Sequence, residues 1–105
     1  MNENFQTIND KLPFYISTLR DSDSFPYNID ENIDDVSINY LSIRNKGTTE
    51  LIVSITPRNT SLPTLGNLYI PANDTVNIIT YVLSEIDIVQ ASDSFYILLC
   101  TRGDK

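Results

Sequence analysis

The chain has 105 residues, a formal net charge of −7, no histidine, no tryptophan and a single cysteine, Cys100. This length supports one hydrophobic core and therefore one domain. Without histidine, a serine–histidine or cysteine–histidine catalytic pair is excluded, and so is a zinc site built on imidazole and thiolate. The acidic balance offers no basic patch to a nucleic-acid backbone, so we expect no nucleic-acid partner.

No segment of the sequence predicts secretion or membrane insertion. Polar residues follow Met1, which leads us to expect no signal peptide. The longest apolar stretches, such as Tyr96 to Cys100, are far shorter than the roughly 20 residues that cross a bilayer. One cysteine cannot form an internal disulfide, which is typical of a chain made in a reducing cytoplasm. The sequons at Asn59 and Asn73 are expected to be chance matches.

The first third of the chain is polar and acidic, and we predict an arm with loops over residues 1–35. A strand is predicted at 12–19, a loop at 21–26 and an acidic connector at 30–35. Residues 1–10 fit either a short helix or a flexible arm, and the sequence does not decide between them.

Residues 36–105 are predicted to form the core of a β-sandwich, because turn signals recur about every 8–12 residues. Strands are expected at 36–43, 50–56, 67–70, 75–83, 86–89 and 94–100. The alternation slips at Tyr40-Leu41, which predicts a bulge or a strand that bridges two environments. Gly47 is available for a positive φ in the following turn. Residues 83–86 are an alternative helical turn. The predicted fold is all-β, a single small sandwich of about six to eight strands, immunoglobulin-like or jelly-roll.

Several predicted strands are apolar on both faces. In the last strand, Phe95, Ile97 and Leu99 alternate with Tyr96, Leu98 and Cys100, and in the 75–83 strand Ile79, Tyr81 and Leu83 are expected on one face. A two-layer sandwich buries only one face of each sheet, so the N-terminal third or another subunit must cover the second face. We favour a mixture of the two coverings that includes self-association, for example as a trimer. The expected interface residues are Ile52, Tyr69, Ile79, Tyr81, Tyr96 and Leu98.

Other motifs favour structural interpretations. Asp21 and Asp23 could supply oxygen ligands to calcium, but Phe25 and Pro26 break the EF-hand pattern, so we expect a solvated acidic loop and no metal. The Arg-Gly-Asp tripeptide at residues 102–104 is expected to be a polar tail. No pair of carboxylates is placed for acid–base work, and Cys100 is expected to be a buried thiol, so we predict no catalytic residue, no cofactor and no enzyme activity.

Tyrosines provide a candidate ligand surface. Tyr69, Tyr81 and Tyr96 are expected to share one sheet face, where they could stack on sugar rings or pack against a subunit. We favour subunit packing, because tyrosine offers a large contact area with few rotatable bonds.

A resemblance rests on five segments between Ile43 and Leu98. They read Ile43-Arg44-Asn45-Lys46-Gly47, Leu51-Ile52-Val53-Ser54-Ile55, Leu68-Tyr69-Ile70-Pro71-Ala72-Asn73-Asp74-Thr75-Val76, Ile86-Asp87-Ile88 and Phe95-Tyr96-Ile97-Leu98. The chain thereby resembles the immunoglobulin-like or jelly-roll modules of tailed-phage virion proteins, in which an Asn-x-Gly turn ends one strand and a Pro-x-x-x-Thr turn opens another. The resemblance implies a small virion component, such as a capsid decoration protein, a head-fibre base or a neck or tail accessory protein.

Three function hypotheses follow. The first is a non-enzymatic structural virion protein, made in the host cytoplasm, that docks on other virion proteins and forms a homo-oligomer. The second is a carbohydrate- or receptor-binding β-sandwich on a phage fibre or a bacterial surface. The third is a small intracellular regulator whose acidic surface mimics nucleic acid and binds a basic protein.

Overall fold

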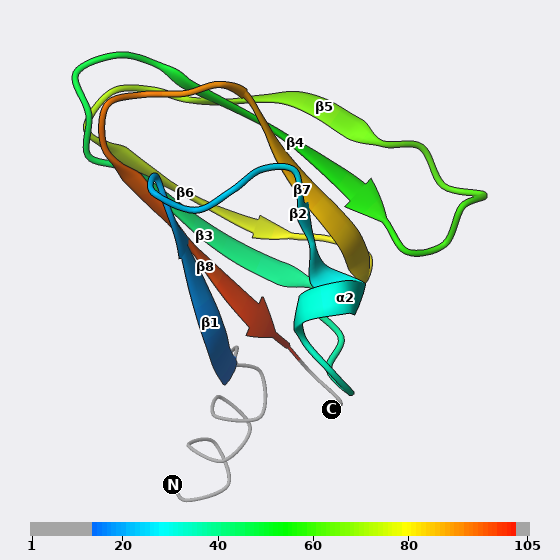
Figure 1. Cartoon of the computed structure of the whole chain (residues 1–105). Helices are drawn as coiled ribbons and strands as arrows, with labels where there is room; N and C mark the ends of the chain where they lie inside the picture. Colours follow the sequence, from blue (N-terminus) through cyan, green and yellow to red (C-terminus); the bar gives the residue numbers. More distant parts are fainter. Residues whose placement is uncertain (1–13, 103–105) are drawn as a thin grey trace, which may run out of the picture.

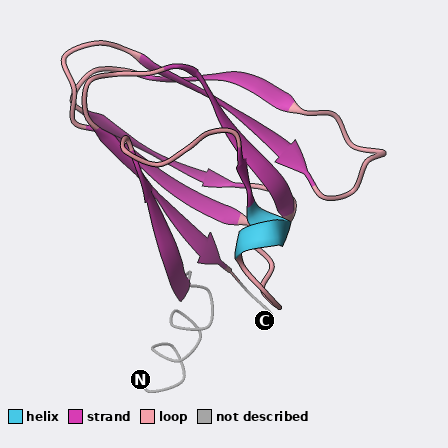
Figure 2. Cartoon of the chain, viewed as in Figure 1, coloured by secondary structure: helices cyan, strands magenta, loops and turns pink. Residues whose placement is uncertain are grey.

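Two four-stranded antiparallel sheets packed face to face form the protein, as seen in a computed structural model that describes residues 14–102 (Figure 1). Sheet A has the order β1-β8-β3-β6, and sheet B has the order β2-β7-β4-β5. The strands of sheet A are β1 (Phe14–Arg20), β3 (Tyr40–Asn45), β6 (Asp74–Ile79) and β8 (Phe95–Thr101). Those of sheet B are β2 (Tyr27–Asn28), β4 (Leu51–Pro57), β5 (Leu65–Ile70) and β7 (Leu83–Gln90). The helix α2 (Ile29–Asn32) follows β2 (Figure 2), and the predicted all-β sandwich is confirmed.

The strand pairing is that of one long hairpin rolled into a sandwich. β1 pairs with β8, β2 with β7, β3 with β6 and β4 with β5, all antiparallel. Two further pairings, β3 with β8 and β4 with β7, complete the sheets. Eight strands rolled in this way form a jelly roll, whereas an immunoglobulin domain distributes its strands in a different order. The sequence left both folds open, and the pairing selects the jelly roll.

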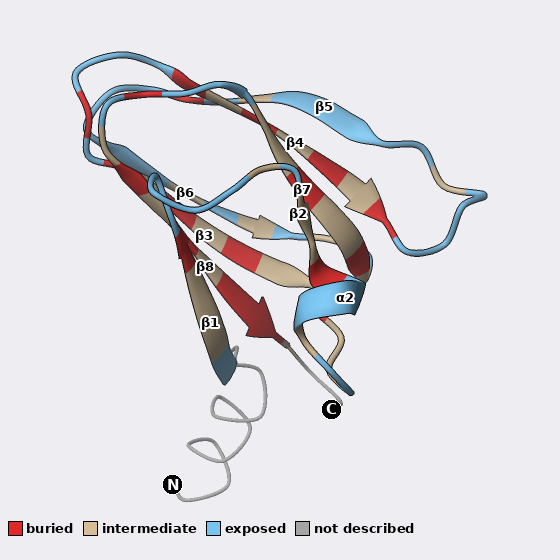
Figure 3. Ribbon diagram, viewed as in Figure 1, coloured by how far each residue is buried: buried red, intermediate tan, exposed pale blue. Residues whose placement is uncertain are grey.

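Alternating apolar residues fill the space between the sheets (Figure 3). In β4, Leu51, Val53 and Ile55 are fully buried while Ile52 lies half-buried on the outer side. The same alternation buries Ile97 and Leu99 of β8. Both assignments agree with the faces predicted from the sequence, because in an extended strand successive side chains point to opposite sides.

The predicted strand over 75–83 is wrong, because the chain changes sheets within it. β6 ends at Ile79 in sheet A, and β7 begins at Leu83 in sheet B. Leu83 is therefore buried in the core while Tyr81, in the connection, is 63% exposed, so these two residues and Ile79 share no face. β7 also continues to Gln90, and residues 83–86 are extended instead of forming the alternative helical turn.

The slip in alternation at Tyr40 marks the start of a strand, not a bulge inside one. Residues 36–39 are irregular, although Ile38 is fully buried, and β3 begins at Tyr40 with Leu41 and Ile43 facing the core. The bulges of the sandwich lie elsewhere, for example between Tyr15 and Ser17 of β1.

The described part of the predicted N-terminal arm belongs to the sandwich. β1 forms an edge of sheet A and β2 an edge of sheet B, and the acidic connector overlaps α2. Asn28 caps this helix, since its Oδ1 accepts a hydrogen bond from the Glu31 N–H at 2.9 Å. Three of the sequence predictions lie wholly or partly outside the described residues. They concern residues 1–10, the start of the 12–19 strand and most of the tripeptide at 102–104.

Candidate functional site

The outward-facing side chains of sheet A form a surface that we call the A face. Residues paired across antiparallel strands point to the same side, so the register arranges this surface in three rows. The rows, each read across β1, β8, β3 and β6, are Tyr15, Cys100, Tyr40 and Ile79; Thr18, Leu98, Ser42 and Asn77; and Arg20, Tyr96, Arg44 and Thr75.

The A face has the composition of a protein-binding surface. It contains three tyrosines, two arginines, a leucine and an isoleucine, but no aspartate, glutamate or lysine, although the chain carries a net charge of −7. Tyrosine and arginine are enriched in the buried centre of protein interfaces, and the three absent residue types are depleted there. Tyr15 and Ile79 are 62% and 65% exposed, so large apolar groups face solvent on this surface.

The two arginines of the A face lie on either side of Tyr96. Arg44 is fixed against the β5–β6 turn, because its Nη2 donates to Asn73 Oδ1 at 2.9 Å and its Nη1 donates to Thr75 Oγ1 at 3.2 Å. Within residues 14–102, the only ion pair joins Arg58 and Asp30. Neither Arg20 nor Arg44 forms an ion pair with a carboxylate of the described residues.

Cys100 lies within the first row, between Tyr15 and Tyr40. The thiol is buried, with 4% exposure, as the sequence predicted. Burial raises the pKa of Cys100, which keeps the thiol protonated and unreactive near neutral pH. Tyr15 is oriented by a 2.7 Å hydrogen bond between its hydroxyl and Thr18 Oγ1.

The structure divides the predicted interface residues among three places. Ile79, Tyr96 and Leu98 lie on the A face, Ile52 and Tyr69 pair on the outside of sheet B, and Tyr81 lies in the β6–β7 connection. The expectation that Tyr69, Tyr81 and Tyr96 share a face is therefore wrong.

Sequence reasoning missed Tyr15, Tyr40, Arg20 and Arg44 as members of this surface. The spacing of Tyr40 and Arg44 within one strand signals a common side. Nothing in the sequence signals that Arg20 and Arg44 lie in one row, because the pairing of β1 and β3 with β8 creates that relationship.

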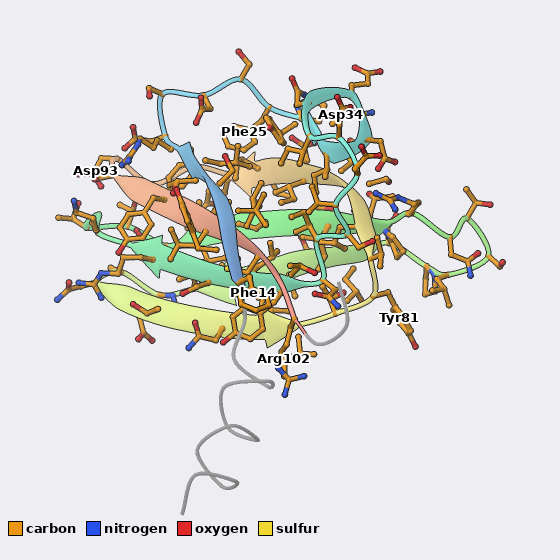
Figure 4. All side chains as sticks on the ribbon, turned by 90° about the horizontal axis from the view of Figure 1, so that it is seen from below. Phe14, Phe25, Asp34, Tyr81, Asp93 and Arg102 are labelled. Atoms are coloured by element: carbon orange, nitrogen blue, oxygen red, sulfur yellow. The ribbon has the colours of Figure 1, made fainter. Side chains whose placement is uncertain are left out.

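A shallow apolar cleft lies at one end of the sandwich, between the β4–β5 and β6–β7 connections. Its volume is about 410 Å³, and its walls are Arg58, Asn59, Leu62, Tyr81 and Val82. The Arg58 N–H donates to the Val82 carbonyl at 2.8 Å, which joins the two connections. Tyr81 projects outward at this end of the molecule (Figure 4). A cleft of this size can take a small ligand.

The acidic side chains near the N-terminus bind the protein's own groups. Asp23 Oδ2 accepts from the Arg20 N–H at 2.6 Å, Asp21 Oδ2 accepts from the Phe95 N–H at 3.3 Å, and Asp30 pairs with Arg58. Across residues 14–102, no three acidic, histidine or cysteine side chains are grouped so as to hold a metal ion.

A second, more polar cleft of about 350 Å³ lies between the loop before β2 and α2. Tyr27 is one of its walls. Burial, and to a lesser extent the Asp23 carboxylate, raise the pKa of Tyr27, so its hydroxyl stays protonated well above neutral pH.

Comparisons with known proteins found no match to this chain: no family model matches it, and neither a curated protein nor a solved structure is significantly similar to it. In the part of the chain that the structure describes, no helix has the length and apolarity to cross a membrane.

Proposed function

We propose that this protein is a non-enzymatic structural component of a tailed-phage virion, a decoration, head-fibre or neck or tail accessory protein, and that it docks on other virion proteins through the A face. The observation that carries the proposal is the composition of that face, in which tyrosine, arginine and aliphatic side chains occur without any acid. Jelly rolls build many viral capsid proteins, which supports this role.

The charge of the A face favours one kind of docking partner. Arg20 and Arg44 favour a partner surface with acidic residues around apolar ones, because complementary charge guides association and disfavours wrong partners. Tyr40 in the first row, Leu98 in the second row and Tyr96 between the two arginines are half-buried and would lose their remaining exposure on docking.

The test is incorporation into particles. Tailed-phage particles are assembled in host cells that supply a tagged copy of the chain, purified on a density gradient and analysed by mass spectrometry. The wild-type chain should co-purify with particles, and Arg20→Glu/Ile79→Glu should be lost from them. Lys46→Glu, a charge reversal like Arg20→Glu at an exposed site beyond the end of β3 and outside the three rows, should be retained. Absence of the wild-type chain from purified particles would contradict the proposal.

A second candidate function, glycan binding, is favoured by the cleft beside Tyr81. The exposed Tyr81 ring lines the cleft together with Leu62 and Val82 and suits the apolar face of a sugar ring, and the Asn59 amide in the same lining can donate to sugar hydroxyls. The chain would then be a carbohydrate- or receptor-binding module on a fibre or a bacterial surface.

A glycan array followed by NMR titration of amide shifts tests this second candidate. Binding should disappear in Tyr81→Ala and persist in Tyr69→Ala, which removes a similarly exposed tyrosine, 57% against 63%, from the outside of sheet B. Equal loss in both variants, or no shift in the cleft residues, would contradict binding at this cleft.

A further inference from the structure

The outer surface of sheet B, which we call the B face, carries charge opposite to that of the A face. Glu85 and Asp87 of β7 point outward beside Thr56 and Ser54 of β4. The other outward residues are Asn28, Ile52, Tyr69 and Gln90. This surface thus has two acids and no lysine or arginine, whereas the A face has two arginines and no acid.

Both faces also present apolar contacts. On the B face Tyr69 is 57% exposed and pairs directly with the half-buried Ile52. On the A face Ile79 is 65% exposed beside Tyr40. Because the two sheets form opposite layers of one sandwich, these surfaces lie on opposite sides of the molecule (Figure 1).

We propose that the occupant of the A face is the B face of a second copy of this chain, so that copies associate head to tail. This inference rests on the proposed docking role of the A face and names the partner. Charge complementarity selects this arrangement, since Arg20 and Arg44 of one copy would meet Glu85 and Asp87 of the next.

The symmetric alternatives bring like charges together. Two A faces in contact would place arginines against arginines, and two B faces would place carboxylates against carboxylates, which is unfavourable in a desolvated contact. A head-to-tail contact leaves one A face and one B face free at the ends of each pair. Association therefore continues beyond a dimer, into a ring if the rotation closes or into a row if it does not.

Two face variants test the arrangement by sedimentation velocity. The A variant is Arg20→Glu/Ile79→Glu and the B variant is Glu85→Lys/Tyr69→Lys. No side chain of these four residues makes a hydrogen bond within residues 14–102, which favours folding of both variants. Far-ultraviolet circular dichroism and thermal melting confirm that each is folded.

Wild-type protein should form species larger than a dimer at low salt and should dissociate as salt rises. Each variant alone should be monomeric. An equimolar mixture should form a 1:1 dimer and stop there, because the intact B face of the A variant meets the intact A face of the B variant. Lys46→Glu and Asp34→Lys, which change charge outside both faces, should associate as the wild type does.

Other outcomes would overturn the inference. If the A variant is monomeric while the B variant associates like the wild type, the A face binds another A face, and the proposed docking role survives without this partner. If the wild type is monomeric at all concentrations, or if mixing the variants yields no dimer, copies do not associate head to tail. The particle experiment tests the proposed function independently of this result. The proposed function is supported if particles incorporate the wild type and do not incorporate the A variant.

Discussion

Asn45 Oδ1 accepts a hydrogen bond from the backbone N–H of Gly47 at 3.0 Å, and this contact fixes the turn that leads from sheet A to sheet B. Asn45 is fully buried at the end of β3. Its Nδ2 donates to the carbonyls of Thr49, Ile70 and Pro71 at 2.8, 3.0 and 3.2 Å. One amide side chain thereby connects the β3–β4 turn with the end of β5.

Replacing Asn45 with alanine should lower the free energy of unfolding by about 2–3 kcal/mol, because it leaves a buried N–H and several carbonyls without partners. Urea denaturation followed by circular dichroism measures the change. Asn77→Ala, at an exposed position on the outside of the same sheet, is the matched control and should change stability by less than about 0.5 kcal/mol. Equal effects in the two variants would contradict the assigned role of Asn45.

Gly47 is required for space and not for a positive φ, which corrects the expectation from the sequence. A Cβ at this position would overlap Asp93 Oδ1 and press on Ser92. Within residues 14–102, the positive-φ residues other than glycine are Asp35, Asn67 and Asn73. Gly47→Ala should therefore cost about 1–3 kcal/mol. Gly66→Ala, where a Cβ meets nothing, should be neutral or slightly stabilising. Thermal melting compares the two, and a neutral Gly47→Ala would show that the turn can relax.

The ion pair between Arg58 and Asp30 should contribute little to stability. Its 2.6 Å contact is short, but both side chains are 42% exposed, so water and salt screen the charges. Asp30→Asn should change the free energy of unfolding by at most about 1 kcal/mol, and the difference should shrink in 1 M salt. A larger, salt-independent loss would show that Asp30 has another structural role.

Alkaline pH should destabilise the fold through Cys100 and Tyr27. Folding raises both pKa values, so the unfolded chain releases these protons at lower pH than the folded chain does. The associated stability is complete below the ordinary thiol value of about 8.5 and is lost as pH rises through the folded-state values. The melting temperature should decline above that pH, and the decline should be smaller in Cys100→Ala and in Tyr27→Phe. An identical pH profile in both variants would exclude these two groups as its cause.

Metal chelation should leave the melting temperature unchanged. Asp21 and Asp23 accept hydrogen bonds from backbone N–H groups instead of being gathered around a common point. A ligand bound by the folded state would raise stability by mass action. A drop in melting temperature with EDTA that calcium restores would reveal a site at these residues.

The sequence by itself determined the fold class and much of the core. The alternation in residues 50–56 and 94–100 identified strands and their buried faces correctly, because the two-residue period of a strand is a local property. The same local pattern failed over 75–83, because the crossing from sheet A to sheet B at Thr80 to Val82 has no periodic signature.

Tertiary structure decided the jelly-roll order and the two charged faces. Arg20 and Arg44 are 24 positions apart in the chain, yet each pairs with Tyr96, because β1 and β3 flank β8 in one sheet. Glu85 and Asp87 lie on the opposite side because β7 belongs to the other sheet. The register of each strand is set by which of its faces is buried in the sandwich. The separation of charge between the A face and the B face therefore exists only when all eight strands are paired.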